Sequence, residues 1–243
     1  MIRVEQVSHH FGKLCALNDV SFTVDNNQIT GLLGLNGAGK TTLMRMIYGL
    51  LVPNKGKIFV DEIDVAKDPD AARARLGVLP DDTGLYKRLT ARENIRYFGE
   101  LQSLGADTLT SNLSELIEIL GMHNIIDRPT EGFSLGERMK TSLARAIIHR
   151  PSHVLLDEPT NGLDVITTRA VRHLLWNLRD SGRSVLFSSH LMHEVDRLCD
   201  RVIIIAKGQV VAQGTPQDIM QQAGLDNLED AFIQLAQVTD QDK

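Results

Sequence analysis

The sequence has few cysteines and no sign of a cysteine-based framework. Its two cysteines, Cys15 and Cys199, lie far apart among the 243 residues, and neither belongs to a CxxC pair. This spacing argues against a network of disulfides and against a thiolate zinc site. A reduced, cytoplasmic compartment is therefore expected.

The sequence also has no long apolar run. The longest such runs, at 29–35 and 202–206, are far shorter than the roughly 20 residues that a membrane-crossing helix needs. The first residues contain no apolar segment typical of a secretory signal. If the protein acts at a membrane, we expect another chain to supply the spans.

An excess of basic residues is absent as well. The 26 Lys and Arg residues are outnumbered by 31 Asp and Glu, which gives a net charge of −5. This balance argues against an extended nucleic-acid-binding face, and we expect no nucleic acid partner. Hydrophobic residues make up 42% and charged residues 23%, which is ordinary for a globular protein whose core needs no covalent support.

Short apolar segments alternate with helical stretches along much of the chain. Several of them are apolar on both faces, as in the buried strands of a parallel sheet. Strand, helix and strand in this rhythm indicate an α/β fold with crossover helices. We expect strands at 21–24, 29–33, 57–60, 76–79, 154–156, 184–187 and 201–205, and helices at 41–48, 165–179 and 191–198.

The stretch from residue 90 to residue 150 is helical instead. Thr90 and Glu93 form a capping box before apolar residues at helical spacing, and a second helix ends at Gly121. A third helix runs over 135–149 and stops before Pro151. We expect one domain, with an α/β core at 1–89 and 151–214, an inserted helical subdomain at 90–150, and a helical tail at 215–243 whose N-cap is Thr215.

A complete phosphate-binding motif lies between an expected strand and an expected helix. Residues 34–41 read G-L-N-G-A-G-K-T and match G-x-x-x-x-G-K-[ST]. In this motif glycines let backbone N–H groups converge on a phosphate, and the helix N-terminus adds its dipole. We expect Lys40 to reach the β- and γ-phosphates and Thr41 to bind Mg²⁺. The flanking strand and helix disfavour a chance match.

Two carboxylates follow the apolar segment at 153–156. Asp157, at the carboxyl end of the expected strand, is placed to hold Mg²⁺ through its water shell. Glu158 can orient an attacking water as a general base. Asp-Glu-Pro also begins ordinary surface turns, but the phosphate-binding motif on the same chain favours the catalytic interpretation.

A second candidate anion site begins the third helix of the insertion. Ser134 and Gly136 lie at its N-terminus, where unpaired backbone N–H groups can bind an anion. The simpler interpretation is that Ser134 is only an N-cap. We expect the two candidate phosphate sites to be too far apart to share one nucleotide unless two subunits face each other.

These motifs show a resemblance that covers nearly the whole chain. The sequence is similar to the ATPase subunit of an ABC transporter, which implies a P-loop NTPase (RecA-like) core with an N-terminal antiparallel β region. The resemblance implies that Phe11 stacks on adenine, whereas the alternative is a core aromatic. It makes 134–137 a degenerate signature and 161–164, with Asp164, the D-loop. His190 becomes the switch histidine near the γ-phosphate. The nucleotide-binding set is completed by Gly34, Asn36, Gly37, Ala38, Gly39, Lys40, Thr41 and Thr42.

The resemblance also implies ligands and partners. ATP and Mg²⁺ are the expected ligands, and Lys40, Glu158 and His190 are the expected catalytic residues. A second ATPase subunit, identical or different, would close head to tail on this one with ATP between them. Closure and opening would move a separate membrane-spanning permease subunit. The chain would then lie peripherally on the cytoplasmic face of the cell membrane.

The sequence departs from the family pattern at several positions. The family usually has Gln after the strand–Pro turn, where this chain has Asp81. Leu135 and Glu137 replace the Gly and Gln of the signature. We expect Asp81 to contact Mg²⁺ more weakly than Gln or through water, and to serve coupling to the membrane partner. The stretch over 77–95 is similar to that of sodium-extrusion, multidrug and antibiotic-resistance exporters, which favours export.

Other interpretations stay open from the sequence. One is a cytoplasmic ABC ATPase not tied to transport; another is a P-loop kinase or GTPase, which would lack the Ser134–Gly136 pair and His190. The order H-x-x-H-E at 190–194 does not match the zinc motif H-E-x-x-H, and we expect His193 and Glu194 on a solvated helix face. A charged helical surface, or a contact with a partner protein or lipid head groups, would account for Arg73, Arg75, Arg88 and Arg92.

Overall fold

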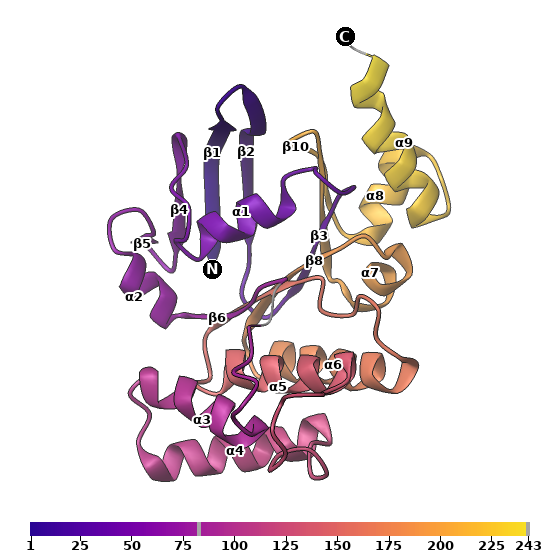
Figure 1. The fold of residues 1–243 in the computed structure, drawn as a ribbon. Helices are drawn as coiled ribbons and strands as arrows, with labels where there is room; N and C mark the ends of the chain where they lie inside the picture. The colour runs from indigo at the N-terminus through magenta and orange to yellow at the C-terminus, as the bar shows by residue number, and fades with distance from the viewer. Residues whose placement is uncertain (82–83, 242–243) are drawn as a thin grey trace.

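Strands and helices alternate through most of the chain, and a group of helices is attached at one end (Figure 1). A computed structural model describes residues 1–81 and 84–241. Because parallel strands alternate with helices and the segment over 91–147 is helical, the expected α/β fold with a helical insertion is confirmed. Among the described residues no helix is long and apolar enough to cross a bilayer.

The central sheet is built from the apolar segments that the sequence indicates. Its strands run in the order β10-β9-β3-β8-β7-β6, and those from β9 to β6 pair in parallel. Every residue of β3, β7 and β8 is buried, because separate cores cover the two faces. The bounds are β3 (Ile29–Leu33), β6 (Leu76–Leu79), β7 (His153–Asp157), β8 (Ser184–Ser189), β9 (Arg201–Ala206) and β10 (Gln209–Gly214); β10, antiparallel to β9, was not predicted.

An antiparallel sheet from the N-terminal part of the chain shares a core with one face of the central sheet. Its strands run in the order β2-β1-β4-β5. Ile2, Val20 and Met44 belong to the same core as Leu32, whereas Leu33 belongs to the core on the other face. Shifts of register along β1 interrupt the regular alternation of its side chains between the two faces of the sheet. The periodicity of the sequence therefore did not predict β1 as a separate strand. The bounds are β1 (Ile2–Phe11), β2 (Leu14–Val24), β4 (Lys55–Val60) and β5 (Ile63–Asp64).

The remaining helices of the core divide between the two faces. Those that share the core of the antiparallel sheet are α1 (Lys40–Ile47) and α2 (Pro69–Ala74). On the other side are α6 (Val165–Asp180), α7 (Met192–Leu198), α8 (Pro216–Ala223) and α9 (Leu228–Gln241). The Thr215 side chain caps α8 with Pro216 in its first turn, as the sequence predicts, whereas 242–243 of the expected tail lie outside the described residues.

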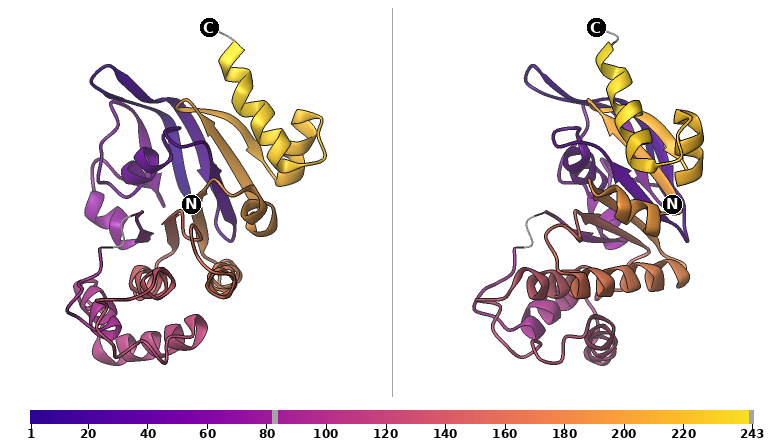
Figure 2. Two further views of the ribbon diagram at one scale, coloured as in Figure 1. Left: turned by 45° about the vertical axis from the view of Figure 1, so that its right-hand side comes forward. Right: turned by 90° about the vertical axis from the view of Figure 1, so that its right-hand side faces the viewer.

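The inserted helices lie at one end of the molecule, and the C-terminal helices lie at the other (Figure 2). They are α3 (Ala91–Leu101), α4 (Ala106–Leu120) and α5 (Leu135–Ile147). The capping box of Thr90 and Glu93 is confirmed, and Gly121 ends α4 with a φ of 58°. α5 ends two residues earlier than the sequence predicts. The apolar faces of these helices share one core with α6 and the central sheet, so the insertion is packed against the core and not merely tethered to it.

Gly77 tests this packing. A Cβ at Gly77 would lie 2.5 Å from the carbonyl oxygen of Ala146 on α5 and 2.7 Å from the Pro151 ring. We expect Gly77→Ala to lower the free energy of unfolding by about 1–3 kcal/mol, as overpacking typically does. The control is Gly105→Ala, where a Cβ meets no atom within 4 Å. Urea unfolding compares the two variants, and equal stabilities would contradict this account of the β6–α5 contact.

Candidate functional site

The phosphate-binding motif forms the loop between β3 and α1. Gly37 and Gly39 have φ values of 82° and 105°, which side chains rarely adopt. A Cβ at Gly39 would lie 2.7 Å from the Ala16 carbonyl oxygen, and one at Gly34 would lie 2.5 Å from that of Ile205. The glycines of the motif are therefore needed both for the turn and for close packing of the loop against the neighbouring backbone.

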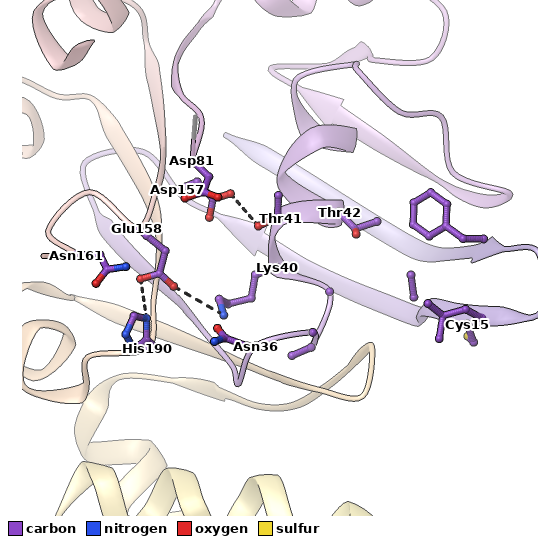
Figure 3. A pocket seen from close by; sticks show the side chains of 16 residues that line it. Cys15, Asn36, Lys40, Thr41, Thr42, Asp81, Asp157, Glu158, Asn161 and His190 are labelled. Atoms are coloured by element: carbon purple, nitrogen blue, oxygen red, sulfur yellow. Dashed lines mark hydrogen bonds and ion pairs between the residues drawn. The ribbon is translucent and has the colours of Figure 1, made fainter. Parts of the chain in front are cut away.

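A pocket of about 440 Å³ lies over this loop (Figure 3). It contains most of the residues that the sequence nominates, which come from five separate stretches of the chain. The predicted residues that line it are Phe11, Asn36, Gly37, Ala38, Gly39, Lys40, Thr41, Thr42, Asp81, Asp157, Glu158 and His190. Leu14, Cys15, Ala16 and Asn161 line it as well. The pocket thus has a phosphate-binding side and, next to Phe11, a largely apolar side.

Lys40 is buried at the first turn of α1, and its ammonium is surrounded by acceptors. Nζ donates to the Gly34 carbonyl at 2.7 Å and to the Leu35 carbonyl at 3.4 Å, and it lies 3.9 Å from Oε1 of Glu158. Burial lowers the pKa of Lys40, although the Glu158 carboxylate opposes this effect. The ammonium is therefore held within the loop, beside the place where a phosphate would meet the backbone N–H groups.

Asp157 lies at the carboxyl end of β7 and is held by two hydroxyl groups. Thr41 Oγ1 donates to Oδ2 at 2.9 Å, and Ser188 Oγ donates to Oδ1. Asp157 is buried, so these bonds compensate for the water that the carboxylate has lost. A hydroxyl and a carboxylate next to a phosphate-binding loop are hard oxygen donors, which fit Mg²⁺. Asp81, just after β6, lines the same pocket.

Glu158 extends into the pocket directly after Asp157. Its backbone has a φ of 51°, and its N–H donates to Ser188 Oγ at 3.0 Å. Its Oε2 lies 2.9 Å from Nδ1 of His190, which follows β8 (Figure 3). The strained backbone and these contacts hold a carboxylate over the phosphate-binding loop, which is the arrangement that a general base requires.

Phe11 borders the other end of the pocket, at the tip of β1. It is 49% exposed, so it is not the core aromatic that the alternative interpretation required. Its ring packs edge-on against His9, with 4.6 Å between the ring centroids. One face of an exposed aromatic ring is thus available for stacking on a planar base, but its role in binding adenine stays a prediction.

The signature residues and Asp164 of the D-loop lie outside the pocket, whereas Asn161, which begins the D-loop, lines it. Ser134 caps α5 and accepts the Glu137 N–H at 3.2 Å, while Asp164 caps α6 and accepts the Thr167 N–H at 2.9 Å. Hydrogen bonds from Thr167 hold the pKa of Asp164 below its ordinary value. A Cβ on Gly136 would lie 2.8 Å from Thr167 Oγ1, so these two helix N-termini are in contact. Neither of them lines the pocket.

One expectation is wrong, and one functional contact was missed. Glu194 does not lie on a solvated face: it is 2% exposed and binds Arg172 of α6. The H-x-x-H-E spacing could not show this, because the partner is a residue of a different helix. Ser188, which holds both Asp157 and the Glu158 backbone, was also missed. Its place two residues before His190, at the end of an apolar strand, was the available signal.

Comparison with known proteins gives a consistent result. The family model described as "ABC transporter" matches residues 17–161. The chain is similar to the "ABC transporter ATP-binding protein NatA" of Bacillus subtilis (strain 168), with 42% identity over 219 residues that cover 90% of this chain and 89% of the relative. It is also similar to the "Lipopolysaccharide export system ATP-binding protein LptB" of Escherichia coli (strain K12), with 36% identity over 208 residues that cover 84% of this chain and 86% of the relative.

A solved structure extends this likeness to three dimensions. It is described as "Structure of ATP binding subunit of ABC transporter" and matches with a TM-score of 0.91. The two sequences are 29% identical, and the match covers 97% of this chain and 99% of the solved one. The likeness therefore includes both the sheet core and the inserted helices.

Lys40→Ala tests the phosphate-binding side of the pocket. The loop would lose its buried ammonium, and charge-assisted hydrogen bonds to phosphate are among the strong ones. We expect nucleotide affinity to fall by about tenfold or more, since hydrogen bonds to charged groups contribute about 1.5–3 kcal/mol. Calorimetric titration with ATP measures this. Lys67→Ala, which removes an exposed ammonium, is the control. Unchanged affinity in Lys40→Ala would contradict the assignment.

Proposed function

The chain belongs to the ABC transporter family as an ATP-binding subunit with ATPase activity, and from this premise we propose that it powers export through a separate membrane-spanning subunit. The observation that carries the proposal is the convergence of Lys40, Glu158 and His190 over one phosphate-binding loop. These residues come from three different elements and supply a cation, a carboxylate and an imidazole to the same pocket.

Glu158 is the general base of the proposed reaction. Its carboxylate is held by His190 and lies in a pocket that water can enter, so it can take a proton from the water that attacks the γ-phosphate. Lys40 exchanges the Gly34 and Leu35 carbonyls for oxygens of the β- and γ-phosphates. His190 orients Glu158 and lies where it can donate to the transferring phosphoryl group.

Thr41 and Asp157 would hold Mg²⁺, with Asp81 contributing through water. The Thr41 hydroxyl and the Asp157 carboxylate already lie 2.9 Å apart, and Ser188 fixes the other carboxylate oxygen. Bound Mg²⁺ neutralises charge that builds up on the phosphates. The contribution of the chain is to place these oxygens beside the loop at little cost in reorganisation.

ATP hydrolysis in this proposal requires a second ATPase subunit. Ser134 and Gly136 lie at the N-terminus of α5, a place that can bind an anion, and they do not line the pocket of their own chain. This arrangement supports closure on the pocket of a facing subunit. Next to the capping residue Asp164, Val165 and Ile166 are 84% and 80% exposed. Exposed apolar residues of this kind are typical of an interaction surface. ATP would lie between the two subunits, whether these are identical or different.

A membrane-spanning permease is the second proposed partner. A groove of about 420 Å³ lies where α1, β6, α3 and α5 meet, and it borders Pro80, directly before Asp81. It is lined by apolar and basic side chains that include Tyr48, Leu50, Phe98 and Arg73. This groove suits an amphipathic segment of the permease and favours the partner-contact interpretation of Arg73. The chain would then lie on the cytoplasmic face of the membrane.

The direction of transport and the roles of the separate segments complete the proposal. We assign ATP binding to the core at 1–89 and 151–214, and coupling to the helical subdomain at 90–150, with 215–243 as a tail. Export is favoured because the relative LptB is named for an export system and because the stretch over 77–95 is similar to that of exporters. That stretch includes Asp81 and the start of the helical subdomain, where pocket and groove adjoin.

Glu158→Gln tests the proposed base. The amide keeps the shape of the side chain but cannot accept a proton, so hydrolysis should fall by about 10²–10⁴-fold. ATP should still bind and hold the subunits together. ATPase assays and size-exclusion chromatography with Mg²⁺ and ATP measure both effects, with the exposed Glu62→Gln as control. Hydrolysis at the parental rate would assign the base elsewhere.

Asp81→Asn tests coupling. The asparagine keeps an oxygen but loses the charge that an Asp brings near the γ-phosphate. We expect ATP affinity to change little, while stimulation of the ATPase by the co-purified membrane protein falls. Rates with and without that protein measure this, with the exposed Asp226→Asn as control. If the subunit alone loses hydrolysis as completely as Glu158→Gln does, Asp81 is catalytic. If no membrane protein accompanies the chain, a cytoplasmic ATPase is favoured.

A further inference from the structure

Arg172 and Glu194 form a two-point contact between α6 and α7, and we propose that both are positioning residues for ATP hydrolysis. Their contact fixes the segment that carries His190 against the helix that begins at Asp164. The proposal rests on the proposed function, because it concerns the placement of His190 beside Glu158. Neither residue lines the nucleotide pocket, so neither is a catalytic residue.

The contact is a partly buried fork, in which the carboxylate is the buried side. Arg172 Nε donates to Glu194 Oε2 at 2.9 Å, and Arg172 Nη2 donates to Oε1. Glu194 is 2% exposed, and its Oε1 also lies 3.2 Å from Nε2 of His193. Two parallel hydrogen bonds to one carboxylate set the direction of both side chains as well as their distance. Val195 and Leu198 hold α7 in the core, and the fork adds a directed contact near the end of α7 that follows His190.

The position of His190 depends on this helix. The His190 side chain is 39% exposed, and its Nδ1 lies 2.9 Å from Oε2 of Glu158. On one side it follows Ser189, which is buried at the end of β8 and accepts the Leu191 N–H at 3.0 Å. On the other side α7 begins, and Glu194 is its anchored residue. The His190 ring therefore lies between two fixed points, of which the fork is the second.

The fork also lies on the helix that Asp164 of the D-loop caps. Arg172 lies about two turns along α6 from Asp164, the residue that caps this helix. Asp164 in turn holds Thr167, against which Gly136 of the signature packs. A buried ion pair is weak support for stability, since its desolvation offsets much of its attraction. Its value here lies in fixing how the His190 segment and the Asp164 helix are oriented to each other.

Arg172→Lys is the main test, because lysine keeps the charge but cannot form the fork. We expect kcat for ATP hydrolysis to fall by about 10- to 100-fold, as displacement of a reacting group by about 1 Å can do. The dissociation constant for ATP should stay unchanged, since the phosphate-binding loop is untouched. Glu194→Gln, which keeps the size of the side chain, should give the same split between kcat and ATP affinity.

Arg179→Lys is the matched control. Arg179 lies on the same helix and reaches Asp200 at 3.3 Å, beyond the far end of α7 from His190. This variant should keep the parental kcat. Thermal unfolding of all variants shows whether a substitution changes stability without changing kcat. A fall in melting temperature with an unchanged kcat in Arg172→Lys would assign the pair a purely structural role and overturn the proposal.

The background variant His190→Ala separates this proposal from a general loss of structure. If the fork acts through His190, adding Arg172→Lys to His190→Ala should lower the remaining rate of ATP hydrolysis little further. Release of radiolabelled phosphate measures this rate. An equal reduction in both backgrounds would overturn the proposal. A parental chain that does not hydrolyse ATP would contradict the proposed function itself, and the proposal with it. An active parent with an unimpaired Arg172→Lys would contradict the proposal alone.

Discussion

The parallel pairing of β3, β7 and β8 is the constraint on which the site depends. The register sets Asp157 opposite Ser188 and Leu33 opposite Ser189, so the strands end at one edge of the sheet. Loops that leave the carboxyl ends of parallel strands meet at such an edge. The phosphate-binding loop, Glu158 and the segment after β8 converge for this reason, although the loop is more than 100 residues away from the other two in the chain.

Different parts of the site are supported by the two different cores of the molecule. The phosphate-binding loop and α1 belong to the core shared with the antiparallel sheet, whereas α5, α6 and α7 belong to the core on the other face. Leu32 and Leu33 are neighbours in β3, yet they contribute to different cores because side chains alternate along a strand. The parts that bind phosphate and the parts that carry Ser134 and Asp164 therefore share the central sheet as their common support.

Charged groups inside this fold are each given a partner. Lys40 donates to its own loop, Asp157 accepts from two hydroxyl groups, and Glu194 accepts from Arg172. Burying a charge without a partner costs free energy, so these side chains can be buried only because the contacts are present. They also fix directions, which gives the pocket its geometry. The carbonyl partners of Lys40 lie within a few residues of it, whereas the hydroxyl partners of Asp157 and the Arg172 partner of Glu194 lie more than 20 residues away in the chain.

The sequence by itself determined the phosphate-binding loop, the strands β3, β7 and β8, and the caps at Thr90 and Ser134. These depend on neighbours within a few residues, so spacing and residue type are enough to predict them. Only the tertiary structure decided that Glu194 is buried, that Ser188 holds Asp157, and which residues border the pocket. The irregular β1 and the edge strand β10 were also not predicted, because their pairing comes from distant strands. Contacts of this kind form only when the sheet brings distant segments together, so the pattern of neighbouring residues in the sequence does not predict them.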